Sequence, residues 1–217
     1  MTHTRTTTTA IEAAAIIAIC FGLSIAGSLN AVAAGFPVSG GEFTNGAMLS
    51  LLAMEVLLSA VALYVLHRRG FAIWTLVPIP TWIGCAWGLV LFVAASLIGW
   101  LLMSLFATSL APQPIERMVQ AAHLSLPVVI AVSVVNGAFE EVFLLGFLMR
   151  GLRGYGLSVA LGMMLLVRIL YHLYQGPVGT VGVFGVGFAF GAFFIRTGKL
   201  WPPVFAHVMF DVIGLST

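Results

Sequence analysis

Long apolar runs, broken only by short polar segments, are the feature that most constrains how this chain can fold. Charged residues make up 7% of the sequence and hydrophobic residues 61%, whereas a soluble domain carries about 25% charged residues. Because so few charges could not cover a surface in water, most of the exterior must face lipid. The runs suit helices of about 20 residues that cross a bilayer, and they lack the alternation of a spanning β-barrel. The sequence therefore predicts an all-α, polytopic transmembrane helical bundle with about seven spans, in a range of roughly six to eight.

These spans use most of the chain and leave no room for a separate soluble domain, so residues 1–217 are predicted to form one transmembrane domain. The predicted spans are residues 10–34, 47–66, 81–107, 124–150, 156–174, 178–196 and 200–215. Residues 71–80 are predicted to lie at the membrane interface, and residues 108–123 to form a loop or a surface helix. In the span 178–196, Gly187 and Gly191 have the GxxxG spacing that lets two helices pack closely.

Positively charged residues predict the orientation of the spans. If the N-terminus is cytoplasmic, the cytoplasmic side receives Arg5, Arg68, Arg69, Arg150, Arg153, Arg196 and Lys199. Only Arg117 falls on the other side, which is the bias expected of a membrane protein. We therefore expect a multi-pass protein of the plasma (inner) membrane with a cytoplasmic N-terminus. The net charge of +2, without a basic run, argues against a nucleic-acid partner.

Ionisable residues within the predicted spans are the next informative feature. A charge at the bilayer centre costs about 2.5–3.5 kcal/mol, so such residues usually face the bundle interior and mark function. Here they are Glu55, Glu140, Glu141, Arg168, His172, His207 and Asp211. For the isolated Glu55 two interpretations stay open, a hydrogen-bonded link between packed helices and a role in catalysis. The others are grouped on three spans.

The spacing of the grouped residues favours one converging site. Two pairs are four residues apart and so share a helix face: Arg168 with His172, and His207 with Asp211. Glu140 and Glu141 are adjacent, so their side chains point about 100° apart around the helix, and we expect only one of them to face the shared centre.

Three short motifs in this region carry a resemblance to a known family. They are EEVFLL at residues 140–145, RILYH at residues 168–172 and HVMFD at residues 207–211. Over roughly residues 125–215, the chain resembles the CPBP (CAAX protease and bacteriocin-processing, or Abi) family of intramembrane proteases, which includes the type II CAAX prenyl endopeptidases. The resemblance implies a catalytic core in these residues, with the catalytic set Glu140, Glu141, His172, His207 and Asp211.

Two positions depart from the motifs of that family. Leu145 stands where the family has an arginine, and Arg168 stands where it has a phenylalanine. A buried Glu141 needs a nearby cation to stay ionised. We therefore hypothesise that Arg168 reaches across from the next span and forms a supporting ion pair with Glu141. The alternative is that this chain has lost the activity of the family.

The resemblance also implies a role for each residue. Glu140 is expected to deprotonate a water molecule, with His172 as its partner. His207 is expected to stabilise the oxyanion, with Asp211 fixing its tautomer and orientation. A catalytic zinc ion is possible, and its ligands would be Glu140, His172 and His207. The absence of an HExxH motif favours a mechanism without metal, so we favour no cofactor.

The leading functional hypothesis is an intramembrane endopeptidase. It would hydrolyse a peptide bond of a membrane-associated protein or peptide, and its partners would be that substrate and membrane lipid. One alternative is an inactive family member that acts as a membrane adaptor or a bacteriocin self-immunity protein. Another is a proton-coupled transporter, since chains of carboxylates and histidines relay protons. The sequence lacks the two related halves and broken helices that transporters often have.

Overall fold

The computed structural model describes residues 5–36, 43–106 and 113–216, and this part of the chain is almost entirely helical. In chain order the elements are α1 (Ala10–Ala33), α2 (Asn45–Arg68), η1 (Ile73–Leu76), α3 (Trp82–Phe106), α4 (Pro114–Gln120), α5 (Leu126–Glu141), η2 (Val142–Met149), η3 (Leu152–Tyr155), α6 (Leu157–His172), η4 (Leu173–Gln175), α7 (Pro177–Thr197) and α8 (Trp201–Ser216). Over these ranges extended residues form only two isolated bridges. The predicted all-α, polytopic bundle is confirmed. Residue 107 of one predicted span, and residues 108–112 of the predicted loop, lie outside the described ranges.

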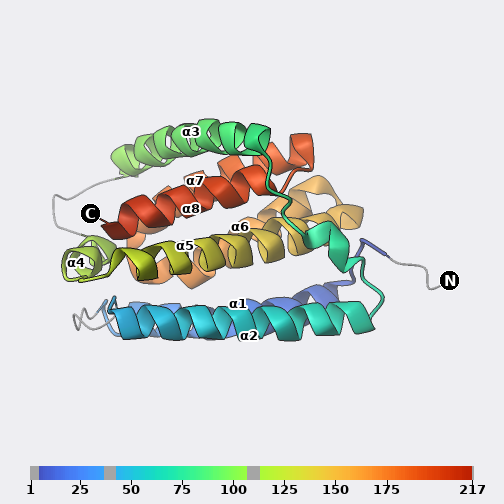
Figure 1. Ribbon diagram of the computed structural model, residues 1–217, viewed down its shortest axis with the longest axis horizontal. Helices are drawn as coiled ribbons and strands as arrows, with labels where there is room; N and C mark the ends of the chain where they lie inside the picture. The colour runs from blue at the N-terminus through green and yellow to red at the C-terminus, as the bar shows by residue number, and fades with distance from the viewer. Residues whose placement is uncertain (1–4, 37–42, 107–112, 217) are drawn as a thin grey trace.

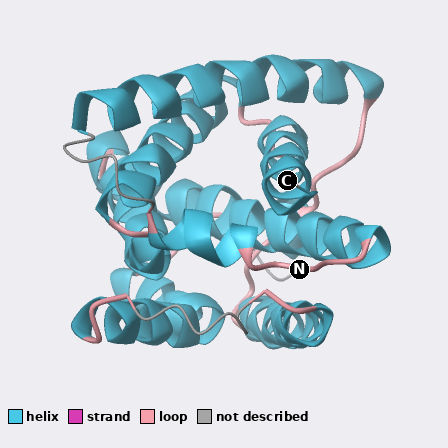
Figure 2. Ribbon diagram, turned by 90° about the vertical axis from the view of Figure 1, so that its left-hand side faces the viewer, coloured by secondary structure: helices cyan, strands magenta, loops and turns pink. Residues whose placement is uncertain are grey.

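The helices are arranged in three layers (Figure 1). α1 and α2 lie side by side in one layer, α5 and α6 form the middle layer, and α3, α7 and α8 form the third. In the middle layer, α5 packs between α2 and α8, and α6 packs between α1 and α7. α3 contacts α7 and α8 and lies obliquely across the top of the bundle (Figure 2). The middle layer is therefore enclosed on both sides.

Six segments of the described chain are long and apolar enough to cross a membrane. They are Ala10–Ala33, Asn45–Arg68, Trp82–Leu105, Leu126–Met149, Leu157–Gln175 and Pro177–Thr197. The predicted seventh span, residues 200–215, is the helix α8, which has 16 residues. At 1.5 Å per residue its length is about 24 Å, which is shorter than a hydrocarbon core of about 30 Å. The chain is thus a multi-pass membrane protein, and its six candidate spans lie within the predicted range.

Cationic residues gather at the end of the bundle that holds the N-terminal segment. Arg5 Nε donates a hydrogen bond to the backbone oxygen of Arg69, at 3.3 Å. The backbone N–H of Thr8 donates to the oxygen of Gly151, which follows Arg150. The end of α2 and the end of η2 therefore meet at one pole of the bundle, as the predicted layout requires. The side of the membrane on which this pole lies stays a prediction.

The predicted span 124–150 is not one uniform α-helix. α5 ends at Glu141, and the chain continues as a wider π-helix, Val142–Met149. The π-helical residues from Phe143 to Met149 are all buried, so this segment lies in the centre of the bundle. Single π-turns within α-helices are frequent at functional sites. This one begins directly after the two adjacent glutamates.

Glycines on α7 let it pack closely against two neighbouring helices. A Cβ atom added at Gly185 would lie 3.2 Å from the Cα of Gly99 on α3. A Cβ at Gly191 would lie 2.6 Å from Leu161 Cδ1 on α6, and one at Gly187 would lie 2.7 Å from Arg168 Cδ. The GxxxG pair is thus part of the contact between α6 and α7, and it leaves room for the arginine of the candidate site.

We expect Gly187→Ala to destabilise the protein by about 1–3 kcal/mol, because the methyl group overpacks the helix contact. The side chain of Arg168 cannot simply move aside, because its guanidinium forms an ion pair with Glu141. The matched control is Gly162→Ala on α6, where an added Cβ would meet nothing within 4 Å and where alanine should stabilise the helix by about 0.5–1 kcal/mol. Unfolding in detergent measures both changes. Equal stabilities of the two variants would contradict this packing.

Candidate active site

Three helices bring the predicted site residues together in the middle of the bundle. α5 supplies Glu140 and Glu141, α6 supplies Arg168, Tyr171 and His172, and α8 supplies His207 and Asp211. Each of Glu140, Glu141, Arg168 and His207 is more than nine-tenths buried. Buried charges need partners to offset the loss of water, so the contacts among these groups define the site.

Glu141 is held from two sides through one oxygen atom. Arg168 Nη2 donates to Glu141 Oε1 at 2.6 Å, and His207 Nδ1 lies 2.6 Å from the same oxygen. A carboxylate oxygen accepts hydrogen bonds, so Nδ1 carries the donated proton and the imidazole presents Nε2 elsewhere. The structure thus contains the predicted ion pair between Arg168 and Glu141. Leu145, where the family motif has arginine, is fully buried in the apolar core.

Glu140 lies on the other side of the His207 ring. Its Oε2 atom accepts a hydrogen bond from the hydroxyl of Tyr171. The same oxygen lies 3.7 Å from Arg168 Nη1 and 3.8 Å from His207 Nε2. Arg168 is therefore bound directly to Glu141 and lies within ion-pair distance of Glu140, which faces the imidazole nitrogen that Glu141 leaves free.

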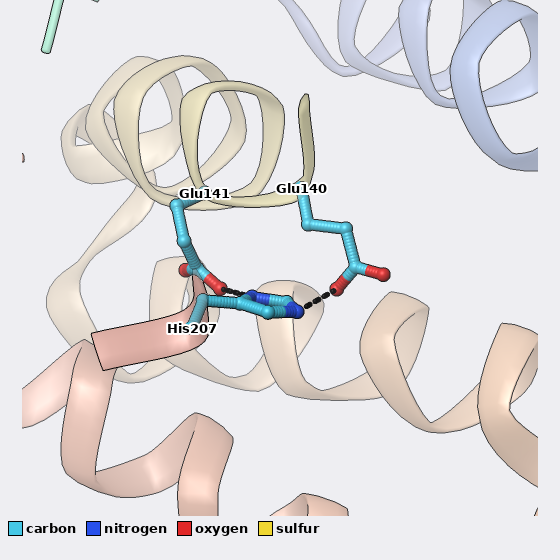
Figure 3. A group of neighbouring side chains, drawn as sticks. All are labelled: Glu140, Glu141 and His207. Carbon is cyan, nitrogen blue, oxygen red and sulfur yellow. Dashed lines mark hydrogen bonds and ion pairs between the residues drawn. The ribbon is translucent and has the colours of Figure 1, made fainter. Parts of the chain in front are cut away.

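Both glutamates lie next to the imidazole of His207, but only Glu140 lines the cavity beside it, in agreement with the expectation that one of the two faces the shared centre. The two side chains do diverge from α5, but the imidazole of His207 lies between them (Figure 3). Its Nδ1 contacts Glu141 and its Nε2 faces Glu140. A ring with a nitrogen on each side can interact with both carboxylates of an adjacent pair, which a rule about one helix face does not consider.

Asp211 does not fix the tautomer of His207, contrary to expectation, because Glu141 holds Nδ1. Asp211 Oδ1 lies 3.6 Å from His207 Nε2, which is too long for a direct hydrogen bond. Asp211 Oδ2 accepts a hydrogen bond from Asn136 Nδ2 at 2.8 Å. Asn136 was not predicted as a site residue. The sequence feature that could have identified Asn136 is its position four residues before Glu140, which places both on the same face of α5.

His172 is separated from the cluster around His207. Its Nδ1 lies 2.9 Å from the backbone oxygen of Arg168, and since a carbonyl only accepts, Nδ1 is the donor. The ring centroid lies 4.3 Å from that of Tyr171 and 6.3 Å from that of Tyr174. The predicted partnership with Glu140 is therefore not a direct contact. Tyr171, which does contact Glu140, was missed because it stands beside the histidine that the motif singles out.

A cavity of about 870 Å³ opens beside these groups. Its polar lining includes Glu55, Asn136, Glu140, Arg168, Tyr171, His172, His207 and Asp211. The remaining wall is mainly apolar, with Phe21, Leu51 and Phe139 among its residues. A mainly apolar pocket of this size with a few polar groups on one wall is typical of a ligand-binding site. Glu141 does not line the cavity and lies behind His207.

The acidic and imidazole groups could be considered as metal ligands. Ligand atoms of Glu140, Glu141 and His207 lie within 4.8 Å of one another. His172 does not belong to this group, so the predicted set of Glu140, His172 and His207 does not converge. The positive charge between the two glutamates is already supplied by the guanidinium of Arg168. Glu141 Oε1 and His207 Nδ1 are engaged with each other, so within this group Glu140 Oε2 and His207 Nε2 are the atoms left to bind a ligand.

Comparison with known proteins gives one match. Residues 122–213 match the family model described as type II CAAX prenyl endopeptidase Rce1-like. No curated protein and no solved structure gives a match. The matched segment contains every predicted catalytic residue and Arg168, whereas Glu55 lies outside it.

Proposed function

Because the chain belongs, through residues 122–213, to the Rce1-like family of type II CAAX prenyl endopeptidases, we propose that it is an intramembrane endopeptidase. Its substrate is a membrane-associated protein or peptide. One observation carries the proposal: Glu140 Oε2 faces His207 Nε2 across 3.8 Å, at the wall of a cavity large enough for a peptide segment.

The gap between these two atoms suits a water molecule. Direct hydrogen bonds need about 3 Å, and His207 Nε2 lies 3.8 Å from Glu140 and 3.6 Å from Asp211. A water molecule at the side of Glu140 Oε2 and His207 Nε2 can contact both atoms at about 2.8 Å. The proposed site therefore holds its nucleophile next to a base and an imidazole nitrogen.

Glu140 acts as the general base in this scheme. It takes a proton from the water as the water oxygen attacks the carbonyl carbon of the scissile bond. The C–N bond of the tetrahedral intermediate then breaks, and Glu140 gives the proton to the departing amine. The hydroxyl of Tyr171 donates to Glu140 Oε2 and orients the carboxylate during both proton transfers.

His207 stabilises the oxyanion of the intermediate. When its ring carries a second proton, Nε2 donates a hydrogen bond to the negative oxygen. Glu141 is a positioning residue, because it fixes the ring through Nδ1. Arg168 balances the charge of Glu141 in turn. In the family motif an arginine stands four residues after the second glutamate. In this chain Arg168 on α6 supplies that positive charge instead.

Proteolysis by purified protein tests this function. The full chain is reconstituted in liposomes with acylated, membrane-anchored peptides, with and without a metal chelator. We expect cleavage whose rate the chelator does not change, because Arg168 supplies the cation between the glutamates. Cleavage that stops with chelator and returns with added zinc would contradict the metal-free mechanism. No cleavage of any peptide would contradict the function.

A further inference from the structure

Glu55 is a buried carboxyl group that the proposed chemistry does not use. It lies within α2, is 4% exposed and lines the same cavity as Glu140 and Asp211. Its Oε2 atom has no hydrogen-bond partner among the residues that the structure describes. Through this atom Glu55 therefore makes no hydrogen-bonded link to another helix within the described part of the chain. A carboxyl group this deep in a membrane protein marks function.

The cavity holds more carboxyl groups than fixed cations. Three acidic residues line it: Glu55, Glu140 and Asp211. Its one arginine, Arg168, is bound to Glu141 at 2.6 Å. Glu55 interacts electrostatically with Glu140, Asp211 and His207, so it belongs to the same electrostatic unit as the site. Such a cavity favours a ligand that brings a positive charge, and it disfavours one that brings a carboxylate.

From this arrangement we propose that Glu55 determines substrate specificity by binding the cationic side chain of a lysine or arginine in the peptide segment that enters the cavity. The inference rests on the proposed function and names its substrate class. The long aliphatic part of such a side chain can pack against the apolar wall formed by Phe21, Leu51 and Phe139, while its charged end reaches the carboxyl group. The unpartnered Oε2 atom then gains its donor.

Matched peptides test the proposal through cleavage. Acylated peptides differ at a single position, which carries lysine, its neutral analogue norleucine or glutamate, and that position is moved along the segment around the cleaved bond. At one position we expect kcat/KM for lysine to exceed that for norleucine about tenfold or more, as for a hydrogen bond to a charged group, with glutamate the poorest. Glu55→Gln should reduce the ratio to about one. The control Glu116→Gln makes the same change at an exposed residue of α4 outside the cavity and should keep the ratio.

Binding measurements separate this inference from the proposed function. The same lysine and norleucine peptides are titrated onto Glu140→Gln protein, with and without Glu55→Gln. If no peptide is cleaved but lysine still binds more tightly in a way that needs Glu55, the function is wrong and the inference stands. If peptides are cleaved without a preference for lysine, or if the preference survives Glu55→Gln, the inference is overturned and the function stands.

Discussion

Glu140→Gln reduces the rate of peptide cleavage by about 10²–10⁴-fold, the usual contribution of a general base. Glutamine has the same shape, and its amide oxygen can still accept the hydrogen bond from Tyr171. It cannot take the proton of the attacking water. The measurement is kcat for a membrane-anchored peptide in liposomes, with the folded state of each variant checked by its elution and its unfolding transition.

A matched control for this variant lies on the surface. Glu116 on α4 is exposed, and Glu116→Gln should leave kcat unchanged. Cleavage by Glu140→Gln at the rate of the unmodified protein would remove Glu140 from the mechanism. If Glu140→Gln lost cleavage because it no longer folded, the absence of a normal unfolding transition would show this.

Arg168→Leu destabilises the protein by about 3–5 kcal/mol, as expected when one partner of a buried ion pair is removed. Arg168 is 2% exposed and Glu141 is fully buried, so the glutamate would be left buried without its cation, and either keeping it ionised or protonating it costs stability. Glu141 Oε2 already lacks a hydrogen-bond partner in the described part of the chain, so His207 Nδ1 alone would still bind this carboxyl group through Oε1. Removing Arg168 should therefore also disorder His207 and lower the cleavage rate.

A double-mutant cycle isolates this pair. Glu141→Gln combined with Arg168→Leu should cost less than the sum of the two single changes, with a coupling of about 0.5–3 kcal/mol in the free energy of unfolding. The comparison pair is Arg5 and Glu12, which are 35% and 20% exposed and should couple by less than about 1 kcal/mol. Strict additivity for Glu141 and Arg168 would contradict the supporting role of the arginine.

The long-range features of the fold follow from simple rules about lipid. Apolar runs of sufficient length predict the helices of the bundle, and the pairing of Arg168 with Glu141 follows from the cost of a lone buried carboxylate. The π-helix after Glu141 does not follow, because its residues have the same apolar character as the α-helix before it. The predicted span 200–215 has 16 residues, and so does α8. Although this length could be read from the sequence, we still predicted a full span there.

The contacts between the site residues were harder to predict than which residues form the site. Helical spacing states which residues share a face, but it does not state which side of an imidazole a neighbour contacts. Glu141 rather than Asp211 therefore took the Nδ1 atom of His207. Tyr171 and Asn136 carry no charge, so the cost of burial did not draw attention to them, although each binds a carboxylate of the site.

Single-turnover cleavage in water enriched in ¹⁸O tests the central claim, that Glu140 and His207 activate a water molecule between them. With the unmodified protein we expect one ¹⁸O atom in the new carboxyl group of the product, and with Glu140→Gln the labelled product should form about 10²–10⁴-fold more slowly. An unlabelled carboxyl group in the product, or labelled product formed equally fast without Glu140, would contradict the account.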